Sequence, residues 1–264
     1  METLSLFIKP WMKLNVEEII KRVKFFGIKN IELPIRAGGF INPENCEEEL
    51  LKLYNLFKNE GITITSIAGN IDERIFKAMH KTGIEYLRIM LPMKAEESFF
   101  DSFLRFKEML KEGEEYSKKY NAKIIIQPHN GRYISNVYEL YCLIKECNPK
   151  YIRAIWDLGH SGLLGEPISK TVDIIFDYLD VVNFKSAYFK KTDNTYKPFY
   201  TIGEESPVNW SEAVDYLLNK GYKGSFCIHA EYTNPLDISK YTEEDNTDEF
   251  LEKDILYIKK IFEK

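Results

Sequence analysis

Strand-like and helix-like segments alternate along the whole chain, and this alternation limits the possible folds more than any other feature. A short apolar or β-branched run is followed, eight times over, by a longer segment with apolar residues at helical spacing. Strands joined through helices run parallel and make right-handed crossovers, so the pattern predicts a parallel sheet. The predicted strands are Leu4–Lys9, Asn30–Pro34, Ile62–Ala68, Tyr86–Leu91, Lys123–Gln127, Tyr151–Trp156, Asp180–Phe184 and Ser225–Ala230.

Helix signals mark the segments between these strands. Asparagine, aspartate or serine stands where a helix can be capped at its start, and glycine often follows its end. The predicted helices are Val16–Phe26 capped by Asn15, Cys46–Asn59 capped by Asn45, a short helix from Asp72 to near Gly83, Ser98–Tyr120, Asn136–Cys147, Pro167–Leu179, a helix from Asn209 or Ser211 to Gly221, and Asp248–Phe262. The long connection from about Ser186 to Val208 is predicted to be an irregular polar loop.

Eight strand–helix units within 264 residues favour an α/β fold with one closed (β/α)8 barrel, a TIM barrel, over residues 1–264. An open, doubly wound sheet is the less favoured alternative. No G-x-G-x-x-G run follows the first strand, which weakens the dinucleotide-binding form of that alternative. No linker-like or low-complexity segment divides the chain, so we expect a single domain.

The charge and hydropathy of the chain argue against nucleic-acid and membrane partners. A net charge of −5 leaves no basic stripe for DNA or RNA, and no apolar run approaches the roughly 20 residues of a membrane span. The N-terminus lacks the basic start and apolar core of a signal peptide, and the four cysteines form no C-x-x-C pair. We therefore expect a reduced, cytoplasmic protein, and a homo-oligomer stays open because symmetric oligomers are common.

Polar side chains gather where the predicted strands end, which is the face on which such barrels carry their active sites. The sixth strand ends in the run Asp157-Leu158-Gly159-His160, which contains a carboxylate and an imidazole. Alternate residues of a strand point the same way, so inward-facing oxygen donors on neighbouring strands are expected to converge. These donors are Gln127, Asp157, Asn183 and Glu231, with His129, Lys185 and His229 at alternate positions beside them.

Four oxygen-bearing side chains around one point suit a hard divalent cation such as Mg2+ or Mn2+. A site richer in thiolate or imidazole would have favoured zinc. Structural roles stay open for several residues near the strand ends. Asp157 can cap a helix turn, Glu32 can pair with Lys9 or Arg88, His229 can be a core residue, Trp210 is expected to pack, and the aromatics Tyr188, Phe189, Phe199 and Tyr200 either cover a sugar or anchor their loop.

With these residues in view, the whole chain resembles the xylose isomerase-like barrels, a sugar isomerase and epimerase superfamily that includes tagatose-type epimerases and inosose dehydratases. The resemblance rests on the D-x-G-H of Asp157–His160, the N-x-K of Asn183–Lys185 where the family often has H-x-K, and the carboxylate of Glu231. A glycine loop before a helix-opening tryptophan is echoed in Ile202-Gly203 and Trp210.

The resemblance implies a divalent metal held by a glutamate, an aspartate, a histidine and a second glutamate from strands five to eight. The residues at these positions are Gln127, Asp157, Asn183 and Glu231. It also implies that the two glutamates move a proton through a metal-stabilised enediolate, and Glu231 alone remains for this role. Because the two amides are weaker ligands than the residues they replace, we expect Mn2+ or Mg2+ to be bound weakly or not at all.

The functional expectation is a sugar or sugar-phosphate isomerase or epimerase of carbohydrate metabolism. Glu231, His160 and Lys185 are the expected catalytic residues, and His129, His160 and Lys185 are expected to bind the substrate, with Lys185 serving a phosphate or carboxylate. Losing one general base typically lowers the rate by about 10²–10⁴-fold, so a carbohydrate-binding barrel without turnover is the alternative. Two-base epimerisation is disfavoured, whereas one-base isomerisation and dehydration stay open.

A third possibility comes from the apurinic-site endonucleases, which share this barrel. These enzymes need a histidine-rich zinc cluster and a basic face for DNA. Four histidines and a net charge of −5 argue against that function.

Overall fold

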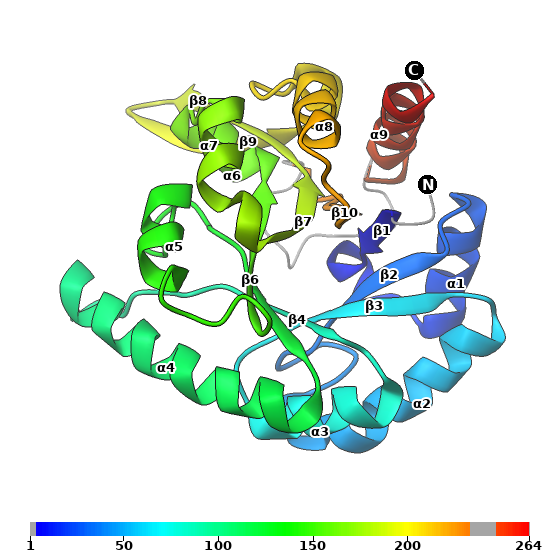
Figure 1. Cartoon of the computed structure of the whole chain (residues 1–264). Coiled ribbons are helices and arrows are strands. Elements are labelled where there is room, and N and C mark those ends of the chain that lie inside the picture. The colour runs from blue at the N-terminus through cyan, green and yellow to red at the C-terminus, as the bar shows by residue number, and fades with distance from the viewer. Residues whose placement is uncertain (1–3, 233–246, 264) are drawn as a thin grey trace.

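The computed structural model describes residues 4–232 and 247–263, and within them eight parallel strands form a closed barrel (Figure 1). The strand order around the ring is β1-β10-β7-β6-β5-β4-β3-β2, and β1 pairs with β2 to close it. The predicted barrel is therefore confirmed, and the open sheet is excluded. The strands are β1 (Leu4–Phe7), β2 (Asn30–Pro34), β3 (Thr63–Ala68), β4 (Tyr86–Ile89), β5 (Lys123–Ile126), β6 (Ile152–Asp157), β7 (Leu179–Phe184) and β10 (Ser225–Ile228).

Helices surround the outside of the barrel, as Figure 1 shows. They are α1 (Val16–Phe25), α2 (Cys46–Asn59), α3 (Glu73–Thr82), α4 (Phe99–Tyr120), α5 (Val137–Ile144), α6 (Leu158–Leu164), α7 (Ile168–Ile175), α8 (Trp210–Asn219) and α9 (Thr247–Phe262). None of the helices in the described residues combines the length and the hydropathy that a membrane-spanning helix needs.

Most of the predicted helix caps are present. The Asn15 side chain accepts a hydrogen bond from the backbone N–H of Glu18 at 2.9 Å, and Asn209 does the same for α8. The cap expected from Asn45 is wrong, because its side chain makes no bond to the start of α2. It accepts instead from the backbone of Asn42 at 3.2 Å, in the short 3₁₀ helix that precedes α2.

The predicted irregular loop from about Ser186 to Val208 is wrong, because most of it forms an antiparallel hairpin. Strands β8 (Ser186–Thr192) and β9 (Thr195–Thr201) pair along their whole length, and β8 packs against α6. The connecting turn places Asp193 at φ 47°, a left-handed conformation that Asp tolerates better than most residues. The polar composition of the segment concealed the hairpin, since both strands lie outside the barrel. Figure 1 shows the hairpin projecting beside α6 and α7.

Several barrel strands end earlier than predicted, and this places the polar residues in the loops above them. Strand β1 stops at Phe7, and a 3₁₀ helix with Pro10 in its first turn follows at Lys9–Trp11. Strands β5 and β10 likewise stop at Ile126 and Ile228, before their expected site residues. The sequence pattern also did not predict α6, which contains two glycines and begins directly after β6.

An apolar layer fills the barrel interior beneath these residues. It consists of Phe7, Ala68, Ile125, Ile155, Val181 and Cys227, while a larger core lies between the strands and the helices. The mouth of the barrel is the end at which the carboxyl ends of its strands lie. Many members of the apolar layer stand two positions before a polar residue of this mouth, as Ile155 does before Asp157. Because alternate residues share a face, the polar layer lies directly on the apolar one, about 6–7 Å further along the strands.

Candidate functional site

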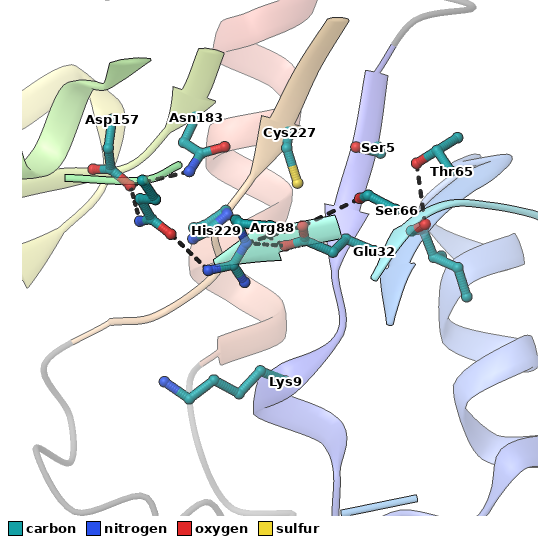
Figure 2. A network of polar contacts seen from close by, with 12 residues as sticks. Ser5, Lys9, Glu32, Thr65, Ser66, Arg88, Asp157, Asn183, Cys227 and His229 are labelled. Carbon is teal, nitrogen blue, oxygen red and sulfur yellow. Dashed lines mark hydrogen bonds and ion pairs between the residues drawn. The ribbon is translucent and has the colours of Figure 1, made fainter. Parts of the chain in front are cut away.

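Asp157 is the centre of a buried polar cluster at the mouth of the barrel. One of its carboxylate oxygens, Oδ2, accepts hydrogen bonds from Gln127 Nε2 at 2.6 Å and from Asn183 Nδ2 at 3.2 Å. The other, Oδ1, accepts from the backbone N–H of His160 at 3.0 Å. Burial alone would raise the pKa of Asp157, but His160 and Lys185 lower it to about 2. The convergence expected from strand alternation is thus present for these three side chains (Figure 2).

Arg88 fixes the orientation of the Gln127 amide. Its Nη1 donates to Gln127 Oε1 at 2.6 Å, and its Nε donates to both carboxylate oxygens of Glu32, at 2.9 and 2.8 Å. A guanidinium can only donate, so the carbonyl of Gln127 must face Arg88 and its NH2 group must face Asp157. Of the two partners that the sequence allows for Glu32, the structure selects Arg88 and not Lys9. Figure 2 shows the resulting chain of contacts from Asn183 through to Ser66.

A second cluster joins Glu231 to two lysines. Lys185 Nζ lies 2.8 Å from Glu231 Oε2, and Lys9 Nζ forms an ion pair with Oε1. Burial opposes the charged form of all three groups, but the two ammonium groups hold the pKa of Glu231 well below its usual range. The same attraction raises the pKa of Lys185, whereas burial lowers the pKa of Lys9. Glu231 is therefore a carboxylate at neutral pH, with a positive charge beside each oxygen.

The glycine of the D-x-G-H run makes room for Lys185. A Cβ on Gly159 would lie 2.8 Å from Lys185 Cγ, closer than real Cβ contacts allow. Asp157 also occupies the N-cap position of α6. Asp157 therefore both caps α6 and contributes to the polar cluster. Gly159 lets the first turn of α6 pack closely against Lys185, the lysine that contacts Glu231.

The two histidines of the mouth have opposite tautomers, both set by Asn130. The carbonyl of Asn130 lies 2.8 Å from His129 Nδ1, which must carry the proton, so His129 Nε2 has a lone pair. The backbone N–H of Asn130 donates to His160 Nδ1 at 3.3 Å, so the proton of His160 is on Nε2. Burial lowers the pKa of both imidazoles, and the ring centroids are 4.2 Å apart. The pair thus offers one acceptor and one donor.

His229 lies between the two carboxylate clusters. Its Nε2 is 3.7 Å from Glu32 and its Nδ1 is 3.8 Å from Glu231, and the residue is 2% exposed. Ligand atoms of Glu32, Cys227 and His229 lie within 4.8 Å of one another, which makes this group a candidate metal site that the sequence did not suggest. Burial raises the pKa of the Cys227 thiol, and Glu32 is already paired with Arg88, so neither group is prepared to bind a cation.

The four residues implied by the family resemblance do not fit a divalent metal in this arrangement. The oxygens of Asp157 face N–H donors, the carbonyl of Gln127 faces Arg88, and those of Glu231 face lysines. Of the side-chain oxygens of these four residues, only Asn183 Oδ1 is buried without a hydrogen-bond partner in the described part of the chain. Within these two clusters the charges also balance without a metal: three acids (Glu32, Asp157, Glu231) stand against three bases (Lys9, Arg88, Lys185).

Other residues of the mouth were missed by sequence reasoning or were only partly anticipated. Tyr200, one of the four aromatics expected in the loop, lies on β9 with its ring 4.7 Å from Lys185 Nζ. Tyr188 and Phe199 instead contact each other along the hairpin, with ring centroids 5.3 Å apart. Trp210 packs as expected: it is fully buried, and a Cβ on Gly203 would overlap its ring. No sequence signal indicated that Arg88 would orient Gln127.

Comparisons with known proteins agree with this architecture. No curated protein matches the chain in sequence. Among solved structures, D-psicose 3-epimerase with D-tagatose from Clostridium cellulolyticum H10 is similar at a TM-score of 0.73 and 12% identity, covering 98% of this chain and 99% of that one. The 3-keto-D-glucoside 4-epimerase of E. coli is similar at 0.71 and 16%, over 98% and 99%.

A xylose isomerase-like TIM barrel protein from Mycobacterium smegmatis, solved in complex with magnesium, is similar at a TM-score of 0.68 and 12% identity, over 98% and 96% of the two chains. At these identities the likeness establishes the fold. The sequence family described as xylose isomerase-like TIM barrel matches residues 20–253, most of the chain. With its closed barrel and its polar residues at the strand ends, the chain belongs to the xylose isomerase-like TIM barrel family.

Proposed function

We propose that the chain is an isomerase or epimerase-type enzyme acting on a small sugar, with Glu231 as the group that moves the proton next to the substrate carbonyl. Family membership and the epimerases among its structural neighbours support this class of reaction. The observation that carries the proposal is the placement of Glu231 between the ammonium groups of Lys9 and Lys185 at the mouth of the barrel.

The lysines supply the positive charge that such a reaction needs. Removing a proton beside a carbonyl leaves negative charge on the carbonyl oxygen, and a fixed cation in a buried site stabilises it strongly. Lys185 is 5% exposed and stays charged, because its attraction to Glu231 outweighs the effect of burial. A substrate carbonyl that accepts from Lys185 in place of Glu231 Oε2 would free that oxygen and make it more basic, so the substrate would then have both a base and a cation within reach.

His129 and His160 could transfer the protons of the substrate oxygens, which Glu231 does not serve. When the carbonyl moves from one carbon to the next, a hydroxyl proton must leave one oxygen and another must arrive. His129 Nε2 can accept a proton, while His160 Nε2 carries one and has no partner among the described residues. This division fits a one-base isomerisation, with Glu231 acting at carbon and the imidazoles acting at oxygen.

Solvent deuterium exchange tests the proposal even while the sugar is unidentified. Ketoses and aldoses are incubated with the protein in D2O, and proton NMR follows loss of the signal next to the carbonyl. We expect exchange with at least one sugar, reduced by about 10²–10⁴-fold in Glu231→Gln. The matched control is Glu48→Gln on α2, which changes an exposed carboxylate and should leave the rate unaltered. Exchange that is equal in Glu231→Gln and the wild type would disprove the role of Glu231.

A carbohydrate-binding barrel without turnover is the second candidate. The amide of Gln127 favours it, since an amide cannot act as the second base of the family. Calorimetric binding of a sugar, together with no deuterium exchange in that sugar, would select this candidate over the enzyme.

A further inference from the structure

A cavity of about 210 Å³ opens where β2, β3 and β4 end, and two arginines line it. Arg36 follows β2 and Arg88 belongs to β4, and the remaining wall includes Asn70 and Tyr133. A water molecule occupies roughly 30 Å³ in the liquid, so the space is large enough for a phosphate or a carboxylate. None of the proton-transfer roles proposed above uses this cavity.

Each arginine has a buried N–H group with no hydrogen-bond partner among the described residues. These are Arg36 Nε and Arg88 Nη2. Arg88 is 4% exposed, and its other nitrogens are already bound to Glu32 and Gln127. A buried donor without an acceptor is costly, and a guanidinium cannot satisfy it by accepting. The two vacant donors therefore favour a ligand that brings oxygen acceptors.

The charge around the cavity favours a negative ligand over a neutral one. Within residues 4–232 and 247–263, no carboxylate lies at ion-pair distance from Arg36, whereas Glu32 already neutralises Arg88. Burial is the main reason why the pKa of Arg36 is lowered, and the charge of Arg88 lowers it further, while Glu231 and Glu32 act in the opposite direction. The three acids and three bases of the two clusters at the mouth balance one another. With Arg36 included, the mouth of the barrel has one positive charge in excess.

The cavity adjoins the residues assigned to proton transfer. Tyr133 lines the cavity, and its ring centroid is 4.6 Å from that of His129. Arg88 lines it as well, and donates to the Gln127 amide that contacts Asp157. One small molecule can therefore reach both places, with one end at the arginines and the other beside the imidazoles.

We propose that Arg36 and Arg88 form an anion-binding subsite for the carboxylate or phosphate of the substrate. The substrate class is then a sugar acid or a sugar phosphate and not a neutral sugar. Lys185, the residue expected from the sequence to hold this group, is instead paired with Glu231. The identification of the ligand as a substrate rests on the proposed function, whereas anion binding itself does not.

Binding calorimetry tests the subsite without turnover. The probes are inorganic phosphate, a hexose phosphate, the matching sugar acid and the neutral hexose, each titrated into the wild type and into Arg36→Gln. We choose Arg36 because it holds no ion pair in the described part of the chain, so its loss should leave the fold intact. The control is Lys52→Gln on α2, which removes an equal charge paired with the exposed Glu48 and the half-buried Glu49.

We expect Arg36→Gln to weaken binding of phosphate or of the sugar acid by about tenfold or more, equivalent to about 1.4 kcal/mol. Arg36→Lys keeps the charge but lacks the planar guanidinium group. Its affinity for phosphate or the sugar acid should therefore lie between those of the wild type and Arg36→Gln. Preference for the hexose phosphate or for the sugar acid identifies the source of the anion. Equal affinities in the wild type, Arg36→Gln and Lys52→Gln would overturn the subsite, as would a neutral hexose that binds as tightly as both charged sugars.

The outcome is independent of the proposed reaction. If no sugar exchanges deuterium but Arg36→Gln still loses anion affinity, the subsite stands and the isomerase proposal fails. If neutral sugars exchange deuterium and Arg36→Gln binds every probe like the wild type, the isomerase proposal stands and the anion-binding subsite fails.

Discussion

Asp254 on α9 should make the stability of the protein fall as the pH rises from about 4 to 7. The carboxyl is 3% exposed, and burial raises its pKa from 3.8 to about 7, despite hydrogen bonds from the Gly203 N–H and the Tyr232 hydroxyl. The folded protein therefore keeps a proton that the unfolded chain releases near pH 4. Folding stability from this group is complete below pH 3.8 and is lost progressively as the pH approaches 7.

The size of this effect follows from the pKa difference. Each pKa unit corresponds to about 1.36 kcal/mol, so a pKa raised from 3.8 to about 7 amounts to about 4 kcal/mol at most. An asparagine has the shape of the protonated acid, can still accept from Gly203, and has no proton to lose. We expect Asp254→Asn to unfold at a higher urea concentration than the wild type at pH 8, with a difference that shrinks towards pH 4.

Urea denaturation at pH 4, 6 and 8, followed by circular dichroism, measures this difference. The control is Asp215→Asn, which changes an exposed carboxylate on α8 and should shift all three midpoints equally. An Asp254→Asn variant that keeps the wild-type dependence on pH would refute the buried, protonated state of Asp254.

Three further substitutions test the polar layer of the mouth. Arg88→Met removes the partner of a buried carboxylate, and we expect urea denaturation to show about 3–5 kcal/mol of lost stability. Gly159→Ala should displace the Lys185 stem, with about 1–3 kcal/mol of destabilisation and slower deuterium exchange; unchanged values for both would argue against the close packing. Gln127→Glu places a second carboxylate beside Asp157, and calorimetry should then detect Mn2+ binding tighter than in the wild type; no gain would count against the ligand positions.

The barrel fold, and the position of its polar side chains at the carboxyl ends of the strands, can be predicted from the sequence because both depend on local periodicity. An apolar run that ends in Asp157 and an alternating Asn183-x-Lys185 fix which side chains point to the mouth, whatever the details of packing. The convergence of Gln127, Asp157 and Asn183 was predictable for that reason. The orientation of the Gln127 amide was not, because it is determined by Arg88, which is itself held by Glu32 from a strand far away in the sequence.

The other features that the sequence did not predict depend on contacts between residues that are far apart in the chain. The β8–β9 hairpin pairs outside the barrel, so its strands lack the apolar runs of buried strands. The short helix α6 contains Gly159 and Gly162, which lower helix propensity, yet Gly159 is needed where Lys185 packs. Lys9 reaches Glu231 across the junction of the first and last barrel strands, although the two residues are 222 positions apart in the sequence.

Deuterium exchange after chelation tests the central proposal most directly: Glu231 moves the proton under the charge of Lys9 and Lys185. The protein is treated with a chelator, its metal content is measured, and exchange into the best sugar substrate is followed by NMR. We expect the chelated wild type to retain its rate and Glu231→Gln to lose it, both without added metal. Loss of exchange on chelation, with recovery on adding Mn2+ or Mg2+, would contradict the role given to the lysines.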